Sequence, residues 1–294
     1  DGTDQPYLAK IANSILNVAS LEHGWKLVPM RISSGGNILR RWITIPSRIS
    51  SYEDITKLVC QLKPLDETYR RARLFAIPEE RIDRMRSELF SYGLGMILGD
   101  ASKEGGQQER LSSMSIDLHL TRKHLTNELL GEFVCMCANS FGIEMNRKKD
   151  KLPTGTTKWG RQPTAAYRWT SERSPMLAWM FSVGLGLNWN ETTSNNQVQM
   201  DWIFNTPYNF RKRFVQALAD SDGTVRRYQV EITSVPNAEF VTKLLHSLGL
   251  NSAYTRTENE KPLRTIVNNK EASRLPIFNE FAKGYRYQKL RQYV

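Results

Sequence analysis

Two aspartates, Asp100 and Asp222, occupy matching positions in two related stretches of the chain. Residues 91–102 read SYGLGMILGDAS and residues 214–225 read FVQALADSDGTV, and each is typical of an apolar helix that ends in an Asp followed by a small residue. A carboxylate at the C-terminal end of a helix faces the negative pole of the helix dipole. Two such carboxylates side by side repel each other, so one of them keeps its proton unless a cation lies between them.

Small residues predict that the two helices pack closely enough to bring these carboxylates together. The first stretch carries Gly95 and Gly99, four residues apart on one helix face. The second carries Ala217 and Ser221 at the same spacing. Such faces allow an approach closer than the usual ~8–10 Å between helix axes. Two aspartates with adjacent backbone carbonyls, at Gly99 and Ser221, suit Mg²⁺. The alternative is two buried helices that each end in a turn, with Asp as a turn residue.

The two stretches resemble the motif of the LAGLIDADG homing endonucleases, in the form that carries two motifs in one chain. The second motif, Leu218-Ala219-Asp220-Ser221-Asp222-Gly223, is a close match, and Met96-Ile97-Leu98-Gly99-Asp100-Ala101 is looser. In the first motif Leu98 and Ala101 replace the usual acid and glycine, whereas the final acid is present in both. The resemblance covers residues 87–294.

The resemblance implies a monomeric, intron-encoded DNA endonuclease that hydrolyses phosphodiester bonds on both strands of a long asymmetric target. It implies Mg²⁺, or Mn²⁺ or Ca²⁺ in the same site, held by Asp100 and Asp222, where the metal activates water and stabilises the leaving 3′ oxygen. The partner is double-stranded DNA, with no obligate protein partner. The alternative is a catalytically silent descendant that acts as an RNA-splicing maturase, with intron RNA as its partner, or as a DNA-binding regulator.

The order of expected elements repeats along the chain. After Asp100 the pattern predicts a polar loop at 103–113, a strand at 114–121, a helix at 123–141, a strand around 165–170 and a helix at 175–185. After Asp222 it predicts a strand at 229–233, a helix at 238–248, strands at 252–257 and 263–267, and a last helix near Ala272. This internal repeat and the resemblance together predict an α+β fold. Two pseudo-symmetric αββαββα repeats, residues 87–190 and 198–294, form a saddle over DNA.

Residues 1–86 are expected to form an N-terminal α/β extension. The pattern predicts a helix at 5–21, two strands within 26–45 around a turn at 33–36, and a helix at 51–62. A basic stretch follows at residues 70–73. The extension is either a small DNA-contacting module or a solvated segment that packs on the main body.

Basic residues on or near the expected strands are the candidates for DNA contacts, because Lys and Arg bind phosphates and Arg also reads guanine. These candidates are Lys103, Arg110, Arg147, Lys149, Lys158, Arg161, Arg168, Arg226, Arg227, Arg256, Lys261 and Arg264.

The resemblance also implies polar strand residues and a basic group beside each motif aspartate. By position, His119 and Glu231 are the strand candidates, and Lys283, Arg286 or Lys289 is the basic group of the second site. The first half has no equally placed lysine. Asp117 and Glu231 are unusual on a surface that binds DNA, so they are either outer-shell metal groups or signs of decayed activity.

Composition agrees with a nucleic-acid partner. The 294 residues carry a formal charge of +11, and the sequence pI is near 9.6, which favours a polyanionic partner. No apolar run approaches the ~20 residues that cross a bilayer, and no signal peptide opens the chain. Three cysteines give no disulfide framework. We therefore expect an intracellular protein, in the cytoplasm, nucleoid or organelle matrix, that is not secreted.

Overall fold

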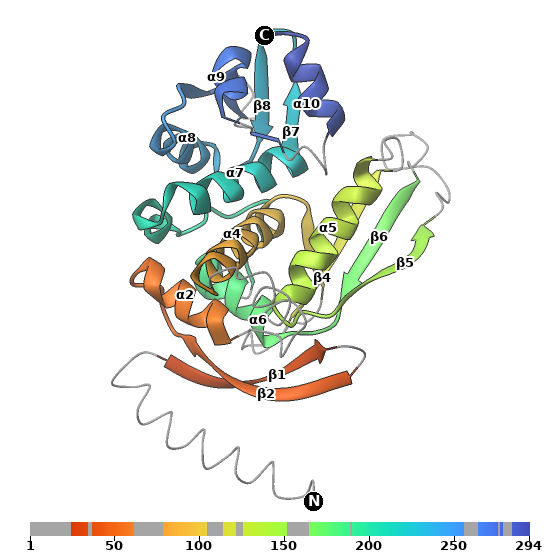
Figure 1. The fold of residues 1–294 in the computed structure, drawn as a ribbon. Coiled ribbons are helices and arrows are strands. Elements are labelled where there is room, and N and C mark those ends of the chain that lie inside the picture. Colours follow the sequence, from red (N-terminus) through yellow and green to blue (C-terminus); the bar gives the residue numbers. More distant parts are fainter. Residues whose placement is uncertain are drawn as a thin grey trace, which may run out of the picture.

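The computed structural model describes residues 25–34, 37–61, 79–104, 114–121, 126–151, 165–188, 190–255, 264–275, 277–278 and 284–294. Two helices lie at its centre, α4 (Glu79–Leu98) and α7 (Tyr208–Asp222), and each leads into one four-stranded antiparallel sheet. In Figure 1, α7 lies against α4, with the elements of the second half on one side of the pair and those of the first half on the other.

The contact between α4 and α7 is close because small residues line it, as the sequence predicts. A Cβ atom added at Gly95 would lie 2.6 Å from the Cβ of Ala217 and 2.6 Å from the backbone oxygen of Phe214. A Cβ added at Gly99 would lie 2.0 Å from the Oγ of Ser221. No real Cβ atom tolerates these distances, so the two glycines permit the approach that sets the motif ends side by side.

The first sheet has the strand order β3-β4-β6-β5. Its strands are β3 (Ala101–Glu104), β4 (Ser115–Thr121), β5 (Met145–Lys151) and β6 (Ala166–Ser171), and α5 (Thr126–Ser140) covers one face. Ile116, Leu118 and Leu120 are buried, as the alternation of the sequence predicts. Trp169 packs against Gly131 of α5, where a Cβ atom would meet its ring at 2.1 Å. The predicted helix at 175–185 is α6 (Pro175–Trp179), which continues as the π-helix η1 (Met180–Gly184).

The second sheet repeats this order as β7-β8-β10-β9. Its strands are β7 (Gly223–Val225), β8 (Gln229–Thr233), β9 (Ser252–Thr255) and β10 (Arg264–Asn268). The helix α8 (Ala238–Ser247) lies between β8 and β9 in the chain, and the 3₁₀ helix η2 (Asp201–Asn205) precedes α7. The chain thus forms an α+β fold with two equivalent antiparallel sheets.

Three expectations about these elements need correction. The segment after Asp100 begins with the strand β3, where the sequence predicted a loop from residue 103. The strand β7 begins directly after Asp222 and was not predicted. The last helix is two helices, α9 (Asn269–Arg274) and α10 (Gly284–Arg291). Strands of three or four residues are too short to show an alternation in the sequence.

The described part of the N-terminal extension packs on the first repeat. Its hairpin, β1 (Trp25–Ser34) and β2 (Asn37–Pro46), follows the predicted alternation, and the predicted helix is α2 (Tyr52–Gln61). Ile45, Ile55 and Leu58 belong to the same buried cluster as α4 and α7. The Trp179 indole N–H donates to the Pro46 carbonyl at 2.5 Å. The predicted helix at 5–21 and the basic stretch at 70–73 lie outside the described residues.

No helix within the described ranges is long and apolar enough to cross a membrane.

Candidate active site

The two motif aspartates come together where α4 and α7 end. Asp222 is the last residue of α7, and Asp100 lies two residues beyond the end of α4 and directly before β3. Both are partly buried. Burial and, to a lesser extent, the negative charge of Asp100 raise the pKa of Asp222 to about 7, against the opposing positive charge of Arg286. The carboxylates are therefore close enough to repel each other, which is the electrostatic conflict that the sequence predicts.

This pair fits a divalent cation. Carboxylate oxygens are the hard ligands that Mg²⁺ and Ca²⁺ prefer. A positive charge at this point would offset both causes that raise the pKa of Asp222, its burial and the charge of Asp100. Among the described residues no group of three or more His, Cys, Asp or Glu side chains gathers. The two aspartates would therefore need backbone carbonyls, such as those of Gly99 and Ser221, water or phosphate oxygens to complete a ligand set.

Arg286 of α10 holds the end of the second motif helix. Its Nη1 atom donates to the backbone carbonyls of Ala219 and Asp220, both at 2.8 Å. These carbonyls belong to the last turn of α7, where a positive charge is favourable. Of the three basic candidates for the second site, Arg286 thus contacts the motif itself. Lys289 is exposed on α10, and Lys283 lies outside the described residues.

Strand register shows which residues of the two sheets are equivalent. In the first sheet Ala101 pairs with Leu118, and Ser102 pairs with Asp117. In the second sheet Gly223 pairs with Ile232, and Thr224 pairs with Glu231. Counted from the motif aspartates, the counterpart of Glu231 is therefore Asp117. The sequence named His119 and Glu231 as the strand residues of the two sites, but His119 corresponds to Thr233, two positions beyond Glu231.

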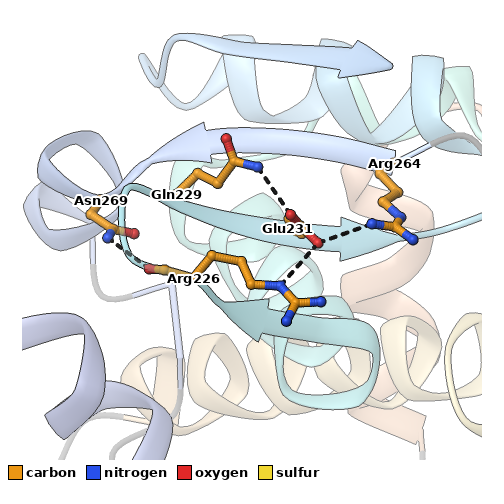
Figure 2. A network of polar contacts seen from close by, with 5 residues as sticks. All are labelled: Arg226, Gln229, Glu231, Arg264 and Asn269. Atoms are coloured by element: carbon orange, nitrogen blue, oxygen red, sulfur yellow. Dashed lines mark hydrogen bonds and ion pairs between the residues drawn. The ribbon is translucent and has the colours of Figure 1, made fainter. Parts of the chain in front are cut away.

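Glu231 lies at the centre of a polar network on the second sheet (Figure 2). Its carboxylate accepts a hydrogen bond from Gln229 Nε2 at 3.0 Å and lies 3.4 Å from Nε of Arg226 and 3.3 Å from Nη1 of Arg264. Burial opposes ionisation, but the hydrogen bond from Gln229 and the charges of Arg226 and Arg264 outweigh it and lower the pKa of Glu231. Asn269 donates to the carbonyls of Arg226 and Arg227, which fixes the turn between β7 and β8.

Asp117 makes the equivalent contact in the first sheet. Its Oδ2 atom accepts a hydrogen bond from Arg168 Nη2 at 2.7 Å and lies 3.6 Å from His119 Nε2. Only 1 % of the Asp117 side chain is exposed. This ion pair explains how a carboxylate that is unusual on a DNA-binding surface is accommodated there, because Arg168 offsets its charge.

The candidate DNA contacts divide between the two faces of the first sheet. Arg147 pairs in register with the buried Trp169, and its guanidinium makes an ion pair with Glu128 of α5 and lies 5.3 Å from the centre of the Tyr167 ring. It therefore lies on the side of the sheet that α5 covers, which does not favour its predicted role as a DNA contact. Its neighbour Lys148 was not selected from the sequence. Lys148 pairs with Arg168, so it shares the opposite face with Arg168.

Of the remaining candidate DNA contacts, three lie on described strands or turns. Lys103 lies in β3 opposite Ile116, and Lys149 is exposed in the irregular part of β5. Arg227 is exposed in the turn after β7, with its guanidinium 5.1 Å from the centre of the Tyr228 ring. The others lie outside the described residues: Arg110, Lys158, Arg161, Arg256 and Lys261.

The motif helices share a polar contact at one point, and the two equivalent positions carry apolar residues. The Tyr92 hydroxyl of α4 donates to Asp220 Oδ2 of α7 at 2.7 Å, across 128 residues of sequence, and both side chains are buried. Counted back from the motif aspartates, Tyr92 corresponds to Phe214, and Asp220 corresponds to Leu98. The two helices are therefore equivalent in shape but not in polarity.

Sequence comparison supports the resemblance of the second motif to the LAGLIDADG family. Residues 209–275 match the family model described as a LAGLIDADG-like domain. That match spans α7, the second sheet and α9, and it confirms the resemblance seen in the second motif. The first sheet has the same strand order after its own motif helix. No curated protein is significantly similar in sequence to the chain.

Several solved structures are similar to the chain at low identity. They include the homing endonuclease I-DmoI in complex with DNA and Ca, with 13% identity over 69% of this chain and 98% of that chain and a TM-score of 0.47. The homing endonuclease I-WcaI bound to its DNA recognition sequence has 12% identity over 69% and 86% of the two chains and a TM-score of 0.46. Full-length WhiA from Thermatoga maritima has 14% identity over 84% and 65% and a TM-score of 0.42.

Proposed function

We propose that this protein is a divalent-metal-dependent endonuclease that cuts both strands of double-stranded DNA at a long asymmetric site. The observation that carries the proposal is the pairing of Asp100 and Asp222 at adjoining helix ends, where burial and mutual repulsion raise the pKa of Asp222 to about 7. A structural turn has no need for this repulsion, whereas a cation site uses it. The LAGLIDADG-like domain at residues 209–275 supports the same function.

In this proposal the chain's own residues hold and align the reacting groups. Asp100 and Asp222 would hold Mg²⁺, which when bound lowers the pKa of a bound water and offsets negative charge on the phosphate. Arg286 fixes the end of α7 and so the position of Asp222. The exposed arginines of the sheets would bind the DNA backbone. Because the two sheets carry different side chains, the two halves of the target would differ.

Substitution of each aspartate tests the proposal. With Mg²⁺ and a library of randomised targets, the wild type should cut both strands, whereas Asp100→Asn and Asp222→Asn should lose cleavage and keep DNA binding. Asp201→Asn, at an exposed aspartate in η2, is the matched control and should cut normally. A wild-type rate of double-strand cutting by either motif variant would refute the metal assignment.

The second candidate function is DNA binding without cleavage. The sequence of the first half favours it, because that half has no lysine placed beside its motif as Lys283 and Lys289 are placed in the second half. Specific binding of duplex DNA by the wild type, with no cleavage in Mg²⁺ or Mn²⁺, would support this candidate over the nuclease.

A further inference from the structure

Each motif aspartate lies level with an arginine across its sheet. In the first repeat, Ala101 pairs with Leu118. One step back along the chain, Asp100 therefore lies at the register position of His119. The partner of His119 on the next strand is Arg168.

The second repeat reproduces this relation. Gly223 pairs with Ile232, so Asp222 is level with Thr233, and the partner of Thr233 on β10 is Arg264. Adjacent strands lie ~4.8 Å apart. The backbone of each arginine is two strands away from its motif aspartate, which is about 10 Å. An arginine side chain and a phosphate together can bridge this distance.

A carboxylate on the strand between holds each arginine. Arg168 Nη2 lies 2.7 Å from Asp117 Oδ2, and Arg264 Nη1 lies 3.3 Å from Glu231 Oε2. The acids are nearly covered, with 1% and 12% of their side chains exposed, whereas the arginines keep 33% and 40% exposure. The exposed edge of each guanidinium is therefore accessible to a second anion while its orientation is fixed.

The same geometry arises from different residues. One repeat uses Asp and the other Glu, and the two acids lie at different distances along the chain from their motif aspartates. The residue opposite Asp117 on the third strand is Thr170, whereas the one opposite Glu231 is Ile266. An incidental surface ion pair has no reason to recur at one register position of both sheets, so the recurrence indicates a shared role.

We propose that Arg168 and Arg264 are equivalent phosphate-binding residues, one for each motif aspartate, and that Asp117 and Glu231 are positioning residues that hold them. The inference rests on the proposed function and names the residues that hold the DNA backbone beside each site. A held guanidinium loses less side-chain freedom when it binds an oxyanion. The paired carboxylate also removes net charge, so the arrangement favours alignment over general affinity for DNA.

Salt dependence of DNA binding tests the arginine. Arg264→Gln should lower the slope of log affinity against log salt by about 0.9 on mixed-sequence duplex DNA, with an equal loss of affinity on every sequence. Arg274→Gln is the matched control, because Arg274 is exposed on α9 and pairs with Glu271. An unchanged slope, or a loss confined to one base-pair position, would show that Arg264 does not bind phosphate.

Single-turnover cleavage tests the carboxylate. Glu231→Leu should bind duplex DNA at least as tightly as the wild type, since a negative charge is removed, but should cut on the order of 10–100-fold more slowly. Glu231→Gln, which keeps an acceptor, should recover part of the rate. Glu239→Gln removes the same charge from the exposed Glu239–Lys243 pair of α8 and should change neither quantity. If Glu231→Leu lost both DNA affinity and melting temperature, the role of Glu231 would be purely structural and the assignment would be overturned.

The outcomes separate the two levels of the proposal. A wild type that binds no duplex DNA refutes the proposed function and this inference together. If the wild type binds duplex DNA and Arg264→Gln has the same salt slope as the wild type, this inference alone is refuted. If the wild type binds without cutting, the salt slope still decides the role of Arg264.

Discussion

The buried hydrogen bond between Tyr92 and Asp220 should contribute strongly to the pairing of the two repeats. It joins α4 to α7 at 2.7 Å in a fully buried setting. Tyr92→Phe removes the donor to a carboxylate, which should lower the free energy of unfolding by about 1.5–3 kcal/mol. Asp220→Leu leaves a buried hydroxyl without this acceptor, which should cost about 1–3 kcal/mol.

The double variant Tyr92→Phe/Asp220→Leu should be more stable than the sum of the single effects predicts. Replacing both partners by apolar groups of similar shape can be nearly neutral, so we expect a coupling energy of about 2 kcal/mol. Urea unfolding of the four proteins, with equal denaturant slopes, measures it. Single effects that add to within about 0.5 kcal/mol would refute the reasoning.

The counterpart positions supply the control. Leu98 and Phe214 are both buried, so Leu98→Asp should bury a carboxylate with no donor from Phe214 and destabilise the protein. Adding Phe214→Tyr to this variant should restore part of the loss, because it recreates the Tyr92–Asp220 pair at the equivalent point. If Phe214→Tyr brings no recovery, the two positions do not face each other.

Three further predictions follow from the described contacts. Without divalent metal, the stability of the wild type relative to Asp222→Asn should fall as the pH rises from 3.8 to about 7, because the raised pKa of Asp222 means that the folded state binds the proton more tightly than the unfolded state. Thermal melts with and without Mg²⁺ measure this difference, and a difference that does not change with pH would contradict the prediction. Gly95→Leu should lower the free energy of unfolding by about 1–3 kcal/mol or more, because it overpacks the helix contact. Gly93→Ala on the same helix should raise it by up to about 1 kcal/mol, because an added Cβ atom would meet only Met180 Cε at 3.6 Å. Equal melting temperatures for the two variants would argue against the close contact of α4 with α7. Arg286→Gln should raise the pKa of Asp222 further, because it removes a positive charge that lowers it. An NMR titration measures the shift, with Arg291→Gln on the same helix as control.

Local pattern was enough to predict most of the fold. The alternation at residues 114–121 gave β4, and the four-residue spacing of Gly95 and Gly99 gave the close contact of α4 with α7. Both signals lie within a few residues of sequence, where strand and helix periods are visible. The basic run at residues 147–149 hid the strand β5, because successive charged side chains mask which face each one takes.

The sequence was enough to name several residues of the candidate site, but not the contacts that join them. Asp100 and Asp222 stand out because each ends a recognisable helix. The contact of Asp117 with Arg168 depends on strand register, which is set by pairing between distant segments, and the sequence does not display it. For the same reason the sequence named His119 beside Glu231, although the register makes Asp117 the counterpart of Glu231. It also named Arg147 as a candidate DNA contact, although its guanidinium pairs with Glu128 of α5.

The unequal polarity of the helix contact means that the two halves of this protein are not interchangeable building blocks. A symmetric assembly of two second repeats would set Asp220 of each copy against Phe214 of the other, and a symmetric assembly of two first repeats would set Tyr92 against Leu98. Each arrangement buries polar groups without partners, at a cost of about 1–3 kcal/mol for each group. Only the pairing of unlike halves satisfies the helices. A chain made of two second repeats should therefore fold poorly, and Phe214→Tyr in both copies should improve it, which thermal melts of the two tandem proteins would show.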